Sequence, residues 1–128
     1  MNGISESAVV AALRRQMTVA TAKQVAVTGN LANIDTPGYK AKEVSFDETL
    51  GKKLLPLNST YPTHKGTGAD SPVTMQESPG LQARRDGNNV QIDRELVTMN
   101  QAASDFAAAQ TALAAKFRLV RYAINETK

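Results

Sequence analysis

The side chains that could catalyse a reaction or hold a metal are few in this sequence. The only histidine is His64, and the chain has no cysteine, which excludes disulfides, thiol catalysis and a zinc site built from His and Cys. His64 lies in a stretch of Ser, Thr, Gly and Pro, where an exposed histidine is much commoner than a catalytic one. We therefore expect neither a metal nor a cofactor.

Three carboxylates, Asp86, Asp93 and Glu95, lie close enough in sequence to suggest acid–base chemistry. Asp93 and Glu95, however, fit the negative charge that is favoured in the first turn of a helix, which is the commoner explanation. No nucleophile, base and oxyanion-binding group come together around them. We therefore expect a protein that is not an enzyme.

The composition favours a small helical protein. The chain has 128 residues, which suits one domain or a small elongated unit. Aromatic residues make up 5%, and Ala supplies much of the apolar content, which favours thin helical packing over a thick core. The net charge is +3, but no basic run exceeds two residues, and nucleic-acid binding usually needs a denser stripe.

No segment of the sequence predicts a membrane span or a cleaved leader. No stretch approaches the ~20 apolar residues that a span needs. Glu6 precedes the apolar residues of the N-terminus, and a positively charged start is missing, which argues against a Sec signal peptide. Export from the cytoplasm would then use a route without a cleaved signal.

The chain divides into three zones. Residues 1–34 predict an N-terminal coiled-coil helix, and residues 90–128 predict a C-terminal one that contains neither Pro nor Gly. Residues 35–89 hold all five prolines and form an irregular connection. The predicted fold is mainly α, with the two long helices packed as an antiparallel coiled coil.

Both terminal zones carry an apolar residue every three or four positions, the periodicity of a coiled-coil seam. The first seam comprises Val10, Leu13, Met17, Ala20, Gln24, Val27, Leu31 and Ile34. The second comprises Ile92, Leu96, Met99, Ala103, Phe106, Gln110, Leu113, Phe117, Val120 and Ile124.

Each seam has one polar position, and both are Gln, which suggests a register. If Gln24 faces Gln110 across an antiparallel pair, Val10 meets Ile124. A buried amide pair satisfies its own donors and acceptors and penalises slipped registers. The alternative is that both Gln side chains lie at the edges of the seam and reach solvent.

The faces away from the seams lack charge. Lys23 is the only charged residue between Gln16 and Ile34, and Asp105 is the only one between Leu96 and Ala115. A helix pair in water needs polar outer faces, so these faces predict further helix contacts. A three- or four-helix core is the alternative, but the connection offers no third long helix. Other subunits should supply the surface, and the free monomer should have mobile terminal regions that order on assembly.

The connection begins with a predicted turn at residues 35–38, where Pro37 presets the first central position and Gly38 accepts a positive φ at the second. Ser45 and Glu48 form a capping-box pattern that predicts a short helix through Lys53.

The second half of the connection predicts a loop and a small sheet. A flexible loop is expected at about residues 56–78. A β-hairpin is predicted from residues 73–76 and 81–84, around Pro79 and Gly80. Asn88 or Asn89 is expected to cap the last helix.

The segment from Asn30 to Lys40 resembles the signature of the bacterial flagellar rod, hook and hook-associated axial proteins. In that family an N-terminal helix ends in an Ala-Asn-x-x-Thr-Pro-Gly-Tyr pattern. The matching residues here are Ala32, Asn33, Thr36, Pro37, Gly38 and Tyr39. Asn33 is placed to satisfy carbonyls at the helix end, Pro37 and Gly38 turn the chain away, and Tyr39 is expected to pack against the helix pair or a neighbour.

The rest of the chain narrows the resemblance to the short proximal-rod members of the FlgB type. Residues 86–95 resemble the segment before the last helix of that type, and the ending 117–124 is similar to it. The longer hook and distal-rod members carry inserted β domains for which this chain has no room. The Ser-Arg-x-Tyr-Gln-Ala-Asn run of the FlgC type is absent.

The resemblance implies a structural subunit of the flagellar basal body, in the rod that crosses the periplasm and transmits torque. It further implies export through the flagellar type III apparatus without a cleaved signal. The implied partners are the protein itself, other rod proteins, and the adaptor and export gate at the rod base. The rival interpretations are a small helical adaptor or secretion chaperone that binds a partner helix, and a basic nucleic-acid-binding protein.

Overall fold

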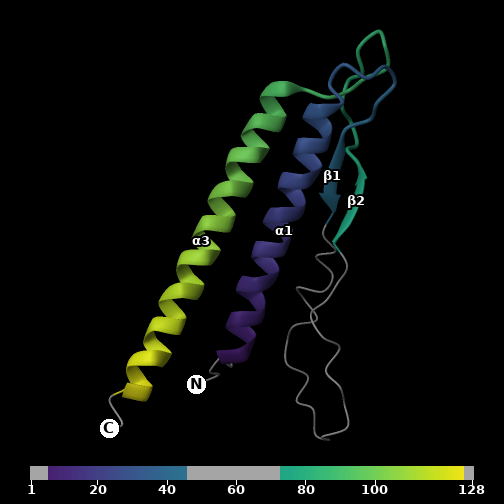
Figure 1. Ribbon diagram of the computed structural model, residues 1–128. Coiled ribbons are helices and arrows are strands. Elements are labelled where there is room, and N and C mark those ends of the chain that lie inside the picture. The colour runs from purple at the N-terminus through teal and green to yellow at the C-terminus, as the bar shows by residue number, and fades with distance from the viewer. Residues whose placement is uncertain (1–5, 46–72, 126–128) are drawn as a thin grey trace, which may run out of the picture.

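Two long antiparallel helices lie side by side, and a two-stranded sheet lies beside the first of them (Figure 1). The computed structural model describes residues 6–45 and 73–125. Helix α1 spans Glu6–Ala32, strand β1 Lys42–Ser45, strand β2 Thr74–Glu77 and helix α3 Ile92–Asn125. This arrangement confirms the predicted fold class of two long terminal helices with a short sheet between them in sequence.

Helix α1 ends and helix α3 begins within two residues of the predicted bounds at 34 and 90. After Ala32, backbone bonds from Asn33 N to Asn30 O (3.2 Å) and from Ile34 N to Leu31 O (3.3 Å) tighten the end of α1 into a 3₁₀-like turn. Pro37 then prevents continuation, because it lacks an N–H donor. Helix α3 has Asp93 and Glu95 in its first turn, as predicted. No described helix combines the length and hydropathy needed to cross a membrane.

The core between the helices consists of small side chains. The buried hydrophobic residues of the described chain are Ala20, Ala26, Val27, Ala41, Val90, Ala102 and Ala109. Small side chains allow the helix backbones to approach closely but bury little apolar area. All the buried positions of α1 lie between Ala20 and Asn30, and those of α3 lie between Glu95 and Ala109. Packing is therefore concentrated towards the end of the pair where α1 finishes and α3 begins, which we call the closed end.

The structure differs from the predicted seam on α3. Its buried positions are Glu95, Ala102 and Ala109, one residue before the predicted line. The predicted seam residues Leu96, Met99, Ala103, Gln110, Phe117, Val120 and Ile124 are exposed in the single chain, as is Ile92, while Phe106 and Leu113 are half-buried. The larger apolar residues flank the contact because Ala packs more closely against α1.

On α1 the predicted seam residues are buried or half-buried. Ala20 and Val27 are buried, and Val10, Leu13, Met17, Gln24, Leu31 and Ile34 are half-buried.

The register that pairs Gln24 with Gln110 is wrong. Asn30 lies beside Glu95, whereas that register would set it level with Ser104, a displacement of about 14 Å along the helix. Gln110 is exposed, as the alternative without a glutamine pair required.

Only one of the two strands of the predicted β-hairpin is present in the sheet. Strand β2 overlaps the predicted strand at residues 73–76, shifted by one residue, but residues 81–84 are not its partner. Strand β1 pairs with β2 in antiparallel register, from Lys42 opposite Glu77 to Ser45 opposite Thr74. Strand β1 was not predicted, because Lys42–Ser45 contains a single β-branched residue, Val44.

Two further predictions fall wholly or partly outside the described residues. Ser45 is the last residue of β1, and the rest of the capping-box segment to Lys53 lies outside them. The predicted loop at 56–78 lies outside them up to residue 72, and its end contains β2.

Candidate functional site

The C-terminal end of α1, the turn after it and the chain before α3 meet in a buried cluster of polar side chains. We call this cluster the polar junction; its members are Asn30, Asn33, Tyr39, Asn88, Asn89 and Glu95. Asn30, Asn88, Asn89 and Glu95 are buried, although each is polar or charged. Buried polar groups are costly unless they are hydrogen-bonded, so their partners decide what the cluster does.

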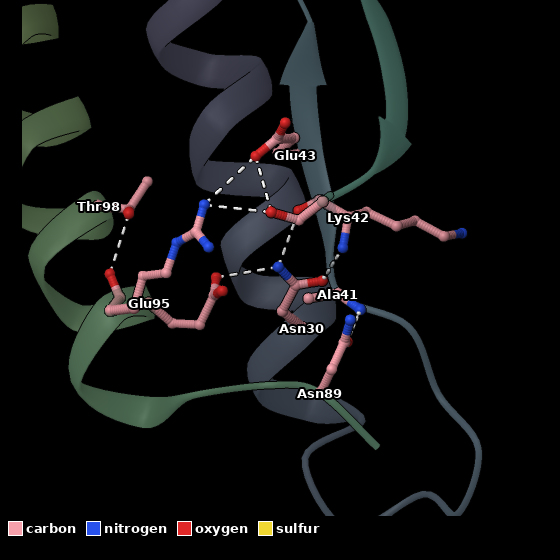
Figure 2. Close-up of polar contacts among 9 residues, drawn as sticks. Asn30, Ala41, Lys42, Glu43, Asn89, Glu95 and Thr98 are labelled. Carbon is pink, nitrogen blue, oxygen red and sulfur yellow. Dashed lines mark hydrogen bonds and ion pairs between the residues drawn. The ribbon is translucent and has the colours of Figure 1, made fainter. Parts of the chain in front are cut away.

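Asn30 is the centre of the polar junction (Figure 2). Its side chain is 1% exposed. Nδ2 donates to Lys42 O (2.8 Å) and to Glu95 Oε2 (2.9 Å). Oδ1 accepts from Lys42 N (2.8 Å) and from the Tyr39 hydroxyl (3.4 Å). Both donors and both acceptor positions of the amide are used, so this one side chain joins α1 to β1 and to α3.

The turn after α1 has the predicted geometry. Tyr39 N donates to Thr36 O (3.3 Å), and Gly38 between them has a φ of 74°. Pro37 and Gly38 therefore occupy the central positions of a type II turn, which requires positive φ at the second. The Tyr39 hydroxyl returns to α1, where it lies beside Asn30 and over Gly29. The expectation that Tyr39 packs against the helix is confirmed.

Asn33 satisfies the end of α1 as predicted. Its Nδ2 donates to Gly29 O (2.8 Å), one of the carbonyls in the last turn of α1. Its Oδ1 accepts from the Thr36 hydroxyl (3.3 Å), which ties the helix end to the turn. The remaining motif residues, Ala32, Pro37 and Gly38, are exposed.

Asn88 binds the turn that follows α1, from 52 to 55 positions away in sequence. Its Nδ2 lies within 3.0 Å of the carbonyl oxygens of Asn33, Ile34 and Thr36. The expectation that Asn88 or Asn89 caps α3 is wrong, because α3 begins at Ile92 and both side chains are used elsewhere. Local sequence gives no signal for a contact that forms across the fold.

The loop before α3 docks on the turn through backbone contacts. Gly38 N donates to Asp86 O (2.9 Å), and Gly87 has a φ of 83°. A Cβ at Gly87 would lie 3.4 Å from Gly38 Cα, an ordinary contact distance, and a Cβ at Gly38 would meet open space. Glycine therefore suits both positions because of their positive φ, not because of crowding. Lys40 Nζ donates to Gly87 O (2.9 Å) across the same contact.

Asn89 completes the connection between the two segments. Its Oδ1 accepts from Ala41 N, and its own N–H donates to Tyr39 O (3.3 Å). Asn88 and Asn89 therefore bind opposite ends of the segment 36–41. The sequence marked residues 30–40 and 86–95 separately, and the structure brings them into one site.

A shallow cavity adjoins the polar junction between α1, β1 and α3. It has a volume of about 170 Å³, and Glu95, Glu43 and Arg94 are among its lining residues. Arg94 pairs with Glu43 at 3.3 Å, and both bond to Ser78, but the pair is partly exposed and adds little stability. Among residues 6–45 and 73–125, no three His, Cys, Asp or Glu side chains gather as metal ligands.

The polar junction can therefore hold backbone segments in place, and the hydrogen bonds described above are used for that purpose. It fixes the closed end of the helix pair and the direction of both helices. Their outer apolar faces are left exposed by the same arrangement.

No protein-family model matches the chain. Comparison with curated proteins finds relatives in several bacteria. The chain is 30% identical over 119 residues to flagellar basal body rod protein FlgB of Bacillus subtilis (strain 168), covering 91% of this chain and 92% of the relative. It is 32% identical over 103 residues to the protein of that name in Escherichia coli (strain K12), covering 66% and 72%. It is 41% identical over 69 residues to that of Aquifex aeolicus (strain VF5), covering 53% of each.

Proposed function

The chain belongs to the family of flagellar basal body rod proteins named FlgB, and we propose on that premise that it polymerises into the proximal rod. In this role it is a structural subunit of the basal body. The rod transmits torque from the membrane motor, so its subunits must resist twisting. A subunit whose helices are joined at one end by a hydrogen-bonded cluster, with every donor and acceptor of the Asn30 amide used, suits that load.

The observation that carries the proposal is the row of exposed apolar side chains on α3. Leu96, Met99, Phe117, Val120 and Ile124 follow the three- and four-residue spacing of a coiled-coil seam, yet all are exposed in the single chain. Exposed apolar area of this extent marks a contact surface in soluble proteins. The predicted seam on α3 is thus proposed as a contact between subunits, while Ala102 and Ala109 serve the contact within one subunit.

The partners of this surface are proposed to be further copies of the chain and other rod proteins in a helical assembly. An adaptor and the export gate are the proposed neighbours at the rod base. The proposed location is the rod in the periplasmic space, reached by export without a cleaved signal. No enzymatic activity, cofactor or nucleic-acid partner forms part of the proposal.

The experiment is to delete the gene, complement it with a tagged copy, and isolate basal bodies. We expect deletion to abolish motility and rod formation, and the tagged chain to be recovered in purified basal bodies. A chain that is absent from basal bodies, or that forms only a stable one-to-one complex with a soluble protein, would contradict the rod function and favour an adaptor or chaperone.

A further inference from the structure

Asp86 and Gly87 form a dipeptide that can react with itself. It is the only Asp-Gly pair in the sequence, and it lies in the loop that docks on the turn after α1. Because glycine has no side chain, nothing shields its main-chain nitrogen from the side chain of the preceding aspartate. Asp86 is exposed and Gly87 is half-buried, so solvent water reaches the pair.

The reaction open to this pair is isomerisation of the aspartate. The Gly87 nitrogen loses its proton and attacks Cγ of the protonated Asp86 carboxyl group. A C–N bond forms, the C–OH bond breaks, and the hydroxyl leaves with the proton as water. Water then opens the succinimide ring at either carbonyl carbon. One opening restores aspartate, and the other gives isoaspartate, in which the main chain runs through Cγ, so solvent water is the only co-reactant.

The fold holds both reacting groups in place. The Gly87 N–H donates to Arg84 O (2.9 Å), so the proton that must leave is engaged. Asp86 Oδ1 accepts from Asn88 N (3.0 Å), which fixes the carboxylate. The carbonyl of the same peptide unit, Asp86 O, accepts from Gly38 N (2.9 Å) in the turn after α1. Ring closure therefore requires the loop to leave that turn, so the reaction depends on local opening of the polar junction.

We propose that Asp86 is a site of isoaspartate formation, which the polar junction shields when it is closed and releases when it opens. Isoaspartate lengthens the main chain by one methylene group and makes the former Asp86 C=O part of a carboxylate. The acceptor for Gly38 N is thereby displaced, and so is Gly87 O, which accepts from Lys40 Nζ (2.9 Å). A chain that stays open is thus converted into one that cannot close as before. Neither step depends on the rod function proposed above.

Peptide mapping of the purified full-length chain, incubated at neutral pH with and without urea, tests the proposal. Electron-transfer fragmentation distinguishes aspartate from isoaspartate, which have the same mass. We expect isoaspartate at position 86 to accumulate at least about tenfold faster in urea, where the junction is open. Asp86→Glu is the chemical control, because its longer side chain cannot close a five-membered ring. Equal rates with and without urea, or no isoaspartate in urea, would overturn the proposal.

Loosening the junction without urea gives a second readout. Asn88→Ala removes the three side-chain bonds to the turn but keeps Asp86, Gly87 and the main-chain N–H of residue 88. We expect isoaspartate to form at least about fivefold faster than in the wild type while circular dichroism still shows the helices. Asn100→Ala, at an exposed position of α3, is the matched control and should react at the wild-type rate. A folded Asn88→Ala chain that reacts no faster than the wild type would sink the proposal.

Lys40→Met serves if Asn88→Ala does not fold. It removes only the bond from an exposed side chain to Gly87 O, so the chain should keep its structure and react at least about twofold faster. Lys23→Met on α1 is its control, and an unchanged rate in Lys40→Met would refute shielding by the junction. The isoaspartate form, separated by chromatography, should melt at a lower temperature than the unmodified chain. Equal melting temperatures would show that the modification leaves closure intact and would overturn that part of the proposal.

Discussion

The side-chain amide of Asn30 donates to Glu95 Oε2 at 2.9 Å, across 65 positions of sequence. This bond is a direct polar link between the end of α1 and the start of α3. The same amide holds both backbone groups of Lys42, so the helix pair and the sheet share one anchor.

Asn30→Ala should destabilise the monomer by about 3 kcal/mol, because it leaves the Glu95 carboxylate and two backbone groups of Lys42 buried without their partner. Urea unfolding followed by circular dichroism would measure the loss. Asn100→Ala is the control, since that residue is exposed on α3 and should change stability by less than about 0.5 kcal/mol. Equal effects of the two substitutions would contradict the anchor.

Asn88→Asp should destabilise the chain more than Asn88→Ala. The aspartate keeps the size of the side chain but places negative charge against three carbonyl oxygens in the turn that follows α1. Alanine only removes the donor, at a cost of about 1–3 kcal/mol. Thermal melts of both variants beside the wild type would show the order. A more stable aspartate variant would show that Asn88 does not act as a donor there.

Gly38→Val should impair rod assembly. The φ of 74° at Gly38 is unfavourable for a β-branched residue, although a Cβ there would meet open space, so the strain is purely conformational. Swimming motility in soft agar is the measurement. Gly80→Val is the matched control, because Gly80 has a φ of 75° with open space around it but lies outside the polar junction. Normal motility of the Gly38 variant would refute the prediction.

Hydrogen exchange on the dilute monomer should show a gradient along the helix pair. We expect the strongest protection near Val27 and Asn30 on α1 and near Glu95 and Ala102 on α3, where side chains are buried. Protection should fall towards the N-terminal end of α1 and the C-terminal end of α3, because local opening is easiest where few side chains are packed. Strong, uniform protection across residues 10–34 would count against mobile terminal regions in the free chain.

Met99→Gln should impair assembly, whereas Ala102→Leu should lower the stability of the monomer. Met99 is exposed, so glutamine should leave monomer stability nearly unchanged and reduce incorporation into basal bodies. Ala102 is fully buried, so leucine should overpack the contact with α1 and cost about 1–3 kcal/mol of stability. Circular dichroism melts and immunoblots of isolated basal bodies would separate the two. If Met99→Gln assembled normally, that part of the α3 surface would not be a subunit contact.

The periodicity and composition of the sequence determined the two helices, because helix formation depends mainly on residues within a few positions of each other. The turn at Pro37 and Gly38 could be predicted in the same way, since the φ preferences of Pro and Gly are local. Asn33 was assigned its cap for the same reason: its carbonyl partner, on Gly29, lies only four residues away.

The tertiary structure alone decided which helix faces meet. A heptad pattern marks an apolar stripe, but it does not say whether that stripe packs within the chain or against another subunit. The contact of α3 with α1 follows Ala102 and Ala109 because small residues let the backbones approach, and the larger residues beside them were left outside. The register followed the bond between Asn30 and Glu95, and no local signal predicts that partnership.

The polar junction shows the same division. Sequence identified the segments around Asn30 and Asn88 as unusual, each by its own local pattern. Their joint role depends on hydrogen bonds between groups more than 50 positions apart, such as that from Asn88 to Asn33 O. Such bonds form only after the chain has closed on itself, so the sequence determined the parts of this subunit and the tertiary structure determined how they are locked together.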